Sequence, residues 1–88
     1  MNEKQLEVIR NGALAWENYT NKDYIDLEGA DLSGLKLAHI SLQNANLKGA
    51  IIVNTDFTAA NLIGADLTGA KITGCTFRNT QLQSSKFI

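Results

Sequence analysis

The sequence predicts an all-β solenoid preceded by one short α-helix. Three observations support this. An apolar residue recurs at every fifth position from Leu27 to Phe87, nine of the twelve residues that follow two positions later are Gly or Asn, and residues 3–18 place apolar side chains at helical spacing. Five matches neither the 3.6-residue period of a helix nor a multiple of the two-residue period of a strand. It fits a short extended step followed by a corner, repeated until the chain coils on itself.

Residues 1–24 are expected to form an N-terminal capping helix and a linker. The apolar face of a helix over 3–18 consists of Leu6, Ile9, Ala13 and Trp16. Asn2 is the candidate N-cap, and Gln5 is the candidate partner in a partial capping box. A solenoid leaves its interior open at each end, so we expect this helix to lay Trp16 over the first coil. A ligand pocket is the alternative interpretation of Trp16. The polar residues 19–24 then lead into the first repeat.

Residues 25–88 are expected to form the solenoid from thirteen five-residue units. Their apolar centres, which we expect to form the structural core, are Leu27, Leu32, Leu37, Leu42, Leu47, Ile52, Phe57, Leu62, Leu67, Ile72, Phe77, Leu82 and Phe87. A smaller residue precedes each centre by two positions, and the alternation of an extended chain turns both inward. The Gly or Asn after each centre turns the backbone at low cost.

These units resemble the A-(D/N)-L-x-x repeats of pentapeptide repeat proteins, most clearly at 29–34 (GADLSG), 44–49 (NANLKG) and 64–69 (GADLTG). The segment 12–18 is similar to one that precedes the repeats in some bacterial members. The resemblance implies a right-handed quadrilateral β-helix with four units per coil, which makes about three coils here. Residues twenty apart should then stack, with Phe57 next to Phe77 and Glu28 paired with Lys48.

Two surfaces are candidates for contact with other proteins. Ile51 and Val53 place apolar side chains at outward positions of one face, where they could form a small patch. The C-terminal coil has no helix comparable to the one at the N-terminus. It is expected to present Phe77, Leu82, Phe87 and Ile88. Two interpretations stay open: the chain pairs with another copy there, as a homodimer, or it is the front of a longer solenoid.

Composition argues against most chemical functions. The net charge of −1 gives no electrostatic reason to expect nucleic acid or an anionic membrane as a partner. Cys75 and His39 are the only residues of their types, and we expect Cys75 to be buried and unreactive. The glycines match no phosphate-binding loop. We therefore expect no enzymatic activity, catalytic residue, metal, cofactor or small-molecule substrate.

The expected function is a non-enzymatic structural or protein-interaction module that presents the flat faces of the solenoid and self-associates at its C-terminal coil. The first residues mix charges and do not resemble a signal peptide, so we expect a cytoplasmic location. Some longer relatives in the resembled family mimic DNA and act on type II topoisomerases, which makes such a modulator the alternative. The sequence identifies neither the protein partner nor the biological process.

Overall fold

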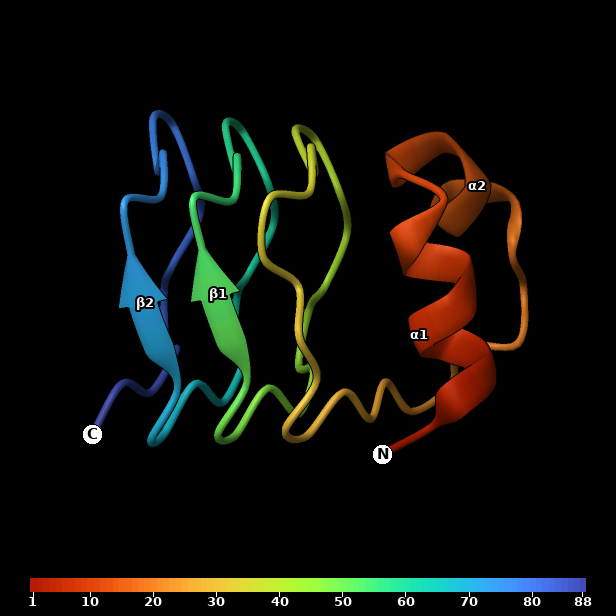
Figure 1. Ribbon diagram of the computed structural model, residues 1–88, viewed down its shortest axis with the longest axis horizontal. Helices are drawn as coiled ribbons and strands as arrows, with labels where there is room; N and C mark the ends of the chain where they lie inside the picture. The colour runs from red at the N-terminus through yellow and green to blue at the C-terminus, as the bar shows by residue number, and fades with distance from the viewer.

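The computed structural model describes all residues from Met1 to Ile88. Two N-terminal helices, α1 (Glu3–Arg10) and α2 (Ala13–Asn18), lie at one end of a coiled chain whose other end carries the C-terminus (Figure 1). Two short strands, β1 (Ile51–Val53) and β2 (Lys71–Thr73), lie on one side of the coil. Neither helix has the length and apolar content needed to cross a membrane.

The coils are joined by parallel pairing with a constant offset. Strand β1 pairs with β2 so that Ile52 lies opposite Ile72. Isolated bridges on other sides of the coil also join residues twenty apart, for example Asp26 with Asn46 and Ser41 with Asn61. Since one repeat has five residues, a coil contains four repeats and has four sides. Every side of one coil therefore lies against the same side of the next.

The backbone turns at each corner through a left-handed conformation. All twelve residues expected at corners have φ between 57° and 73°. Six are glycines, and three are asparagines, the other residue type that accepts this conformation readily. Ala59, with φ 57°, shows that the fold also holds a residue with no special preference at such a corner.

The Asp or Asn before many centres stabilises the corner that follows. The Asp66 carboxylate accepts hydrogen bonds from the Thr68 N–H at 3.0 Å and from its hydroxyl at 2.5 Å. Asp56 is bonded to Thr58 in the same way. The hydrogen bond from the threonine hydroxyl, and to a smaller extent the one from its N–H, lowers the pKa of each carboxyl group below the ordinary aspartate value. The recurring acidic residue is thus a turn-stabilising group, and is not merely a polar residue facing solvent.

The core is one cluster of eighteen buried apolar residues that extends from the helices through the coils. Phe57 and Phe77 stack with their ring centroids 5.7 Å apart. The centres from Leu27 to Leu67 are buried. The last four centres are less covered: Ile72, Phe77 and Leu82 are half-buried, and Phe87 is 47% exposed. They are exposed because no further coil lies over them.

Polar residues at the inward small positions donate hydrogen bonds to the neighbouring coil. Thr55 Oγ1 donates to the Leu32 carbonyl at 2.7 Å, and Thr80 Oγ1 donates to that of Phe57 at 2.7 Å. Cys75 Sγ contacts the Ile52 carbonyl at 3.1 Å in the same arrangement. The expectation of a buried Cys75 is wrong, because this residue lies in the last coil and is partly exposed.

The N-terminal segment contains two helices where the sequence predicted one. Gly12 has φ 103° and ψ 173°, which ends the helical path between α1 and α2. Asn2 is the N-cap, as predicted, and its side chain accepts a bond from the Gln5 N–H at 3.0 Å. The capping box does not form, because the Gln5 side chain is buried and bonds to the first coil instead of to Asn2.

Candidate interaction surfaces

The C-terminal coil, defined as residues 68–88, carries an exposed apolar surface. Phe77 and Leu82 are half-buried, Phe87 is 47% exposed, and Ile88 is fully exposed. In the coil beneath, Phe57 is fully buried by the residues stacked on it. The four side chains named from the sequence thus lie together on the last coil.

The same coil has an open backbone edge. One coil earlier, the N–H groups of Phe57 and Leu62 donate to the next coil at 2.9 and 2.8 Å. The equivalent N–H groups of Phe77 and Leu82 make no backbone hydrogen bond. An unpaired strand edge is a template for pairing with another chain. The C-terminal coil therefore combines apolar side chains with unpaired hydrogen-bonding groups.

Charge is distributed unevenly along the solenoid axis. Residues 68–88 contain Lys71, Arg78 and Lys86 and no acidic side chain. Seven of the nine acidic residues lie within residues 1–31, at the other end. A shallow hollow on the C-terminal coil is lined by Thr68, Ser85, Lys86, Phe87 and Ile88. This end is thus basic and apolar together.

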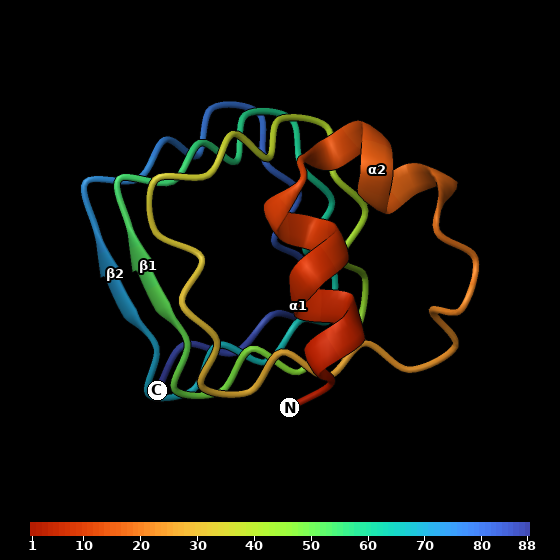
Figure 2. The ribbon, with the colours of Figure 1, turned by 45° about the vertical axis from the view of Figure 1, so that its right-hand side comes forward.

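The N-terminal end differs, because α1 crosses it and α2 follows at its edge (Figure 2). Ile9 and Trp16 are fully buried in the core cluster, with Leu6 and Ala13 partly buried beside them. Trp16 Nε1 donates to the Ser41 carbonyl at 2.9 Å. Lys22 Nζ lies 5.0 Å from the centre of the Trp16 ring, a favourable cation–π contact. These contacts hold the Trp16 side chain against the first coil.

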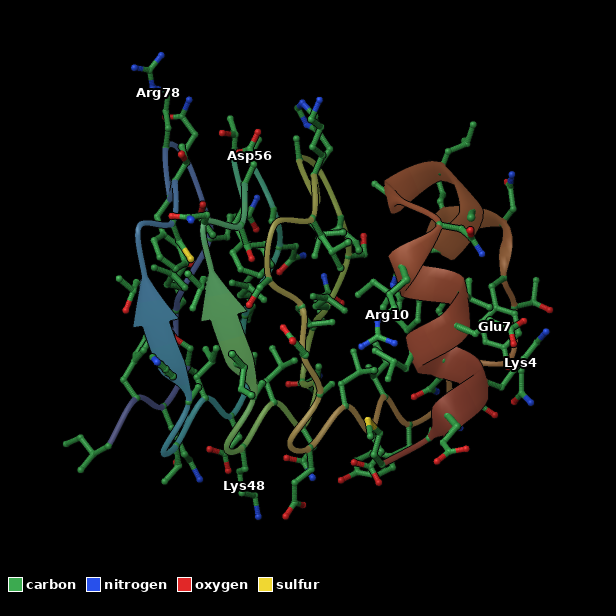
Figure 3. All side chains as sticks on the ribbon, in the orientation of Figure 1. Lys4, Glu7, Arg10, Lys48, Asp56 and Arg78 are labelled. Atoms are coloured by element: carbon green, nitrogen blue, oxygen red, sulfur yellow. The ribbon has the colours of Figure 1, made fainter.

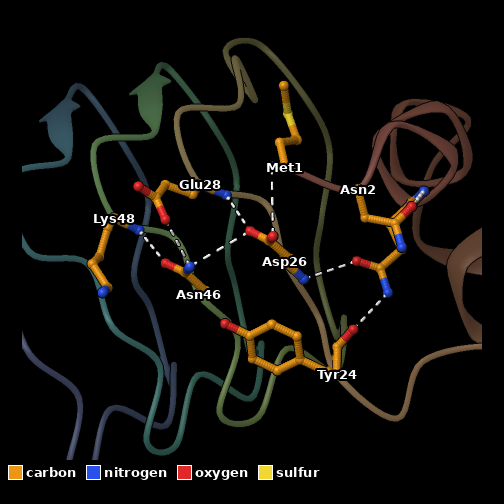
Figure 4. A network of polar contacts seen from close by, with 8 residues as sticks. Met1, Asn2, Tyr24, Asp26, Glu28, Asn46 and Lys48 are labelled. Atoms are coloured by element: carbon orange, nitrogen blue, oxygen red, sulfur yellow. Dashed lines mark hydrogen bonds and ion pairs between the residues drawn. The ribbon is translucent and has the colours of Figure 1, made fainter.

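A polar network joins the N-terminus to the first coil (Figure 4). Gln5 Nε2 donates to the Tyr24 carbonyl at 2.8 Å, and Gln5 Oε1 accepts from the Asp26 N–H at 2.9 Å. The Met1 ammonium lies 3.5 Å from the Asp26 carboxylate. Sequence reasoning did not find this role of Gln5. Its spacing of four residues from the buried Ile9, which puts both on one face of α1, was the available signal.

Glu28 forms a different contact from the one predicted. Its carboxylate accepts a hydrogen bond from Asn46 Nδ2 at 3.0 Å and is not paired with Lys48. The Asn46 side chain is held in place by a second bond, in which its Oδ1 accepts from the Lys48 N–H at 3.1 Å. The fixed amide therefore satisfies Glu28 in place of the flexible ammonium group.

The side face around β1 carries the other predicted patch. Ile51 is 40% exposed and Val53 is half-buried, while Ile52 between them points into the core. The neighbouring residues on this face, Lys71 and Thr73 of β2, are polar. Ile51 and Val53 therefore form a small apolar area on a polar face.

The reactive residue types do not converge. His39 occupies an exposed corner of the first coil, whereas Cys75 lies in the last coil. No group of three or more His, Cys, Asp and Glu side chains is arranged to hold a metal ion. A cleft at the junction of α2 and the first coil brings Glu17, Lys22 and His39 near one another. The lysine of this cleft is engaged in a structural contact, because Lys22 Nζ donates a hydrogen bond to the Trp16 carbonyl at 2.5 Å.

Comparison with known proteins gives one family. The family model described as "Pentapeptide repeats" matches the chain in eight copies, over residues 25–62, 40–79 and 60–88. No curated protein matches. Eight chains of solved structures match. One is the crystal structure of a pentapeptide repeat protein (Rfr23) from the cyanobacterium Cyanothece 51142, with 25% identity and a TM-score of 0.34. The match covers 72% of this chain and 60% of the length of that one.

Proposed function

Because the chain belongs to the pentapeptide repeat family, whose right-handed β-helices generally serve as structural or protein-interaction modules, we propose that it is a non-enzymatic interaction module. We propose further that it associates with a second copy through the C-terminal coil. The observation that carries this proposal is the exposure of Phe87 and Ile88 beside an unpaired strand edge. The proposal also includes a capping role for α1 and α2, supported by the burial of Ile9 and Trp16 in the common core.

Burial supplies the driving force for this association. Covering a large apolar side chain stabilises a complex by about 1.5–3 kcal/mol. Phe77, Leu82, Phe87 and Ile88 retain exposed surface on each copy. When two copies bind through the same patch, both patches are covered and none is left for a third copy, so the assembly stops at two. The expected product is a symmetric dimer joined at the two C-terminal coils.

Charge predicts how this dimer responds to salt. Each copy brings Lys71, Arg78 and Lys86 toward the contact, with no acidic side chain of the same coil to offset them. Like charges repel, and salt screens this repulsion over about 8–10 Å at physiological ionic strength. Raising the salt concentration should therefore tighten the dimer.

A matched pair of substitutions tests the proposed interface. Phe87→Asp places a charge on the C-terminal coil, whereas Ile51→Asp places one on the side face at a position of similar exposure, 40% against 47%. Sedimentation equilibrium at micromolar concentration should give a dimer for the wild type and Ile51→Asp, and a monomer for Phe87→Asp. A wild-type monomer at every salt concentration would refute self-association. Loss of the dimer in Ile51→Asp alone would assign it to the side face.

The alternative, a DNA-mimicking modulator of a type II topoisomerase, receives no support from the charges. Such a mimic requires an acidic surface along its whole length. The acidic residues here gather at the N-terminal end, and the C-terminal coil is basic. We therefore propose the protein-interaction role alone. A binding assay against gyrase is expected to show no complex at tens of micromolar.

A further inference from the structure

We propose that α1 and α2 act as a stop that prevents the C-terminal coil of a second copy from adding to the first coil, head to tail. The occupant that the helices exclude is thus another copy of this chain. The inference rests on the proposed function in one respect, since the proposed dimer and the excluded head-to-tail contact both use the C-terminal coil as the binding surface. It adds a reason why association ends at two copies instead of continuing as a fibre.

The first coil has an edge that would accept a preceding coil. Within the solenoid, the carbonyl before each apolar centre accepts a hydrogen bond from the coil on its N-terminal side. The Ile51 carbonyl, for example, accepts from the Leu32 N–H at 2.8 Å, and the Asn61 carbonyl accepts from the Leu42 N–H at 2.8 Å. In the first coil the equivalent carbonyls belong to Asp26, Asp31, Lys36 and Ser41. No coil precedes them.

The helical segment supplies the missing donors on three of the four sides. The Asn2 N–H donates to the Asp26 carbonyl at 2.8 Å. Arg10 Nη2 donates to the Asp31 carbonyl at 3.3 Å, and Trp16 Nε1 donates to the Ser41 carbonyl at 2.9 Å. Gln5 Oε1 adds an acceptor for the Asp26 N–H at 2.9 Å. Main-chain and side-chain groups of this segment thus replace the hydrogen bonds that a preceding coil would make.

The open edge of the C-terminal coil has the matching donors. In a head-to-tail contact, the first repeat of one copy takes the place of the next five-residue unit after the last repeat of the second copy. The amides of the second copy's Ile72, Phe77, Leu82 and Phe87 then face the carbonyls of Asp26, Asp31, Lys36 and Ser41, in that order. The Phe77, Leu82 and Phe87 amides make no backbone hydrogen bond within their own chain. The two edges therefore carry complementary groups in register.

Charge favours the same contact. In this register Lys71 of the second copy lies beside Asp26, because outward residues stack as do Asp26 and Asn46 within one chain. The first coil also carries Glu28 and Asp31, whereas all charged side chains of the C-terminal coil are basic. Opposite charges meet head to tail, and like charges meet tail to tail. A head-to-tail contact leaves one free edge at each end and so propagates without closing.

The test weakens docking of the helices without adding charge. Gln5→Leu/Arg10→Ala/Trp16→Phe removes four hydrogen bonds and keeps most of the apolar contact. At about 1 kcal/mol for each bond, the population with undocked helices should rise by at least about a hundredfold. The control is Lys4→Ala/Glu7→Ala, which removes an exposed ion pair of α1 (Nζ–Oε1 3.1 Å) on the side that faces away from the coil (Figure 3).

At low salt and tens of micromolar, the triple variant should sediment as species larger than a dimer, whereas the control should behave as the wild type. Salt at 0.5 M, or an added Lys71→Glu, should return the triple variant to the wild-type size, because both remove the attraction between opposite charges. A folded triple variant of wild-type size would overturn the inference. So would large species that resist both salt and Lys71→Glu, since these indicate aggregation through exposed core.

Two further results keep the inference separate from the proposed function. A wild-type monomer together with a salt-sensitive polymer of the triple variant refutes self-association of the native protein and supports the stop. A wild-type dimer together with a dimeric triple variant does the reverse. If circular dichroism shows that the triple variant is unfolded, the single substitution Arg10→Ala, at an exposed residue, is measured in the same way. A smaller salt-sensitive increase in mass is expected, and no increase would overturn the inference.

Discussion

The close approach of Asn44 to Gly64 allows a quantitative test of how neighbouring corners constrain each other. A Cβ atom added to Gly64 would lie 2.2 Å from Asn44 Oδ1 and 3.3 Å from its Cγ. Gly34 has a nearly identical backbone, with φ 73° against 71°, and a Cβ added there would meet nothing within 4 Å. Gly34→Ala is therefore the matched control for Gly64→Ala.

The two substitutions share one cost and differ in another. Alanine in the left-handed conformation costs about 1–2 kcal/mol, offset by about 0.4–1 kcal/mol from the restricted unfolded chain. Gly34→Ala should therefore lower the free energy of unfolding by about 1 kcal/mol. Gly64→Ala adds the collision with Asn44 Oδ1, at the end of an exposed side chain that must leave its preferred rotamer, which costs about 0.5–1.5 kcal/mol. We expect a total loss of about 1.5–2.5 kcal/mol.

Urea unfolding followed by circular dichroism measures both losses, which appear as lowered midpoints with an unchanged slope. Asn44→Gly removes the colliding atom and keeps the left-handed corner, so the excess cost of Gly64→Ala should vanish in that background. Equal losses for Gly34→Ala and Gly64→Ala would refute the reasoning. An excess that persists with Asn44→Gly would do the same.

Three further sets of substitutions test other contacts. The pKa values of Asp56 and Asp66 are lowered in the folded protein. These carboxylates therefore stabilise the fold at any pH above the ordinary aspartate pKa of about 3.9, and this contribution is lost as the pH falls through their folded-state pKa values. Replacing both by Asn, which can still accept the bond from the turn amide, should flatten the fall in urea midpoint below about pH 4; an unchanged pH profile would contradict this. Trp16→Phe should cost at least about 1 kcal/mol in thermal unfolding, because the bond to Ser41 is lost and the smaller ring fills less of the buried site. Thr55→Val should cost about as much, with Thr55→Ala as the comparison that also loses volume.

The family and the repeating coil could be predicted from the sequence, and the family match confirms the assignment to pentapeptide repeats. The reason is that the residues within each five-residue unit determine its local conformation. Leu47 and Phe57 point inward because of the alternation within one extended step, and residues such as Gly49 turn the chain within the same five residues. No distant contact is needed to set that period.

The helical segment and the edges of the solenoid could be predicted only in outline. Apolar spacing identified the buried Ile9 and Trp16, but a single helix was expected where Gly12 separates two. The Gln5 and Arg10 side chains bond to backbone groups of residues 19 and 21 positions further along the chain. Backbone carbonyls are present in every residue and leave no mark in the sequence, so these partners could not be deduced from residue types.

Local chemistry therefore accounts for which residues face inward and where the chain bends, whereas the four units per coil were implied by the family resemblance and are seen in the pairing of residues twenty apart. Stacking decides the rest, because burial and hydrogen bonding at each position depend on whether another coil or a helix lies over it. Phe57 and Phe87 occupy equivalent positions in their repeats, yet the first is fully buried and the second is 47% exposed. The residues of one repeat do not determine what packs against that repeat. The surfaces proposed for interaction lie where a neighbouring coil is absent or has been replaced by helices.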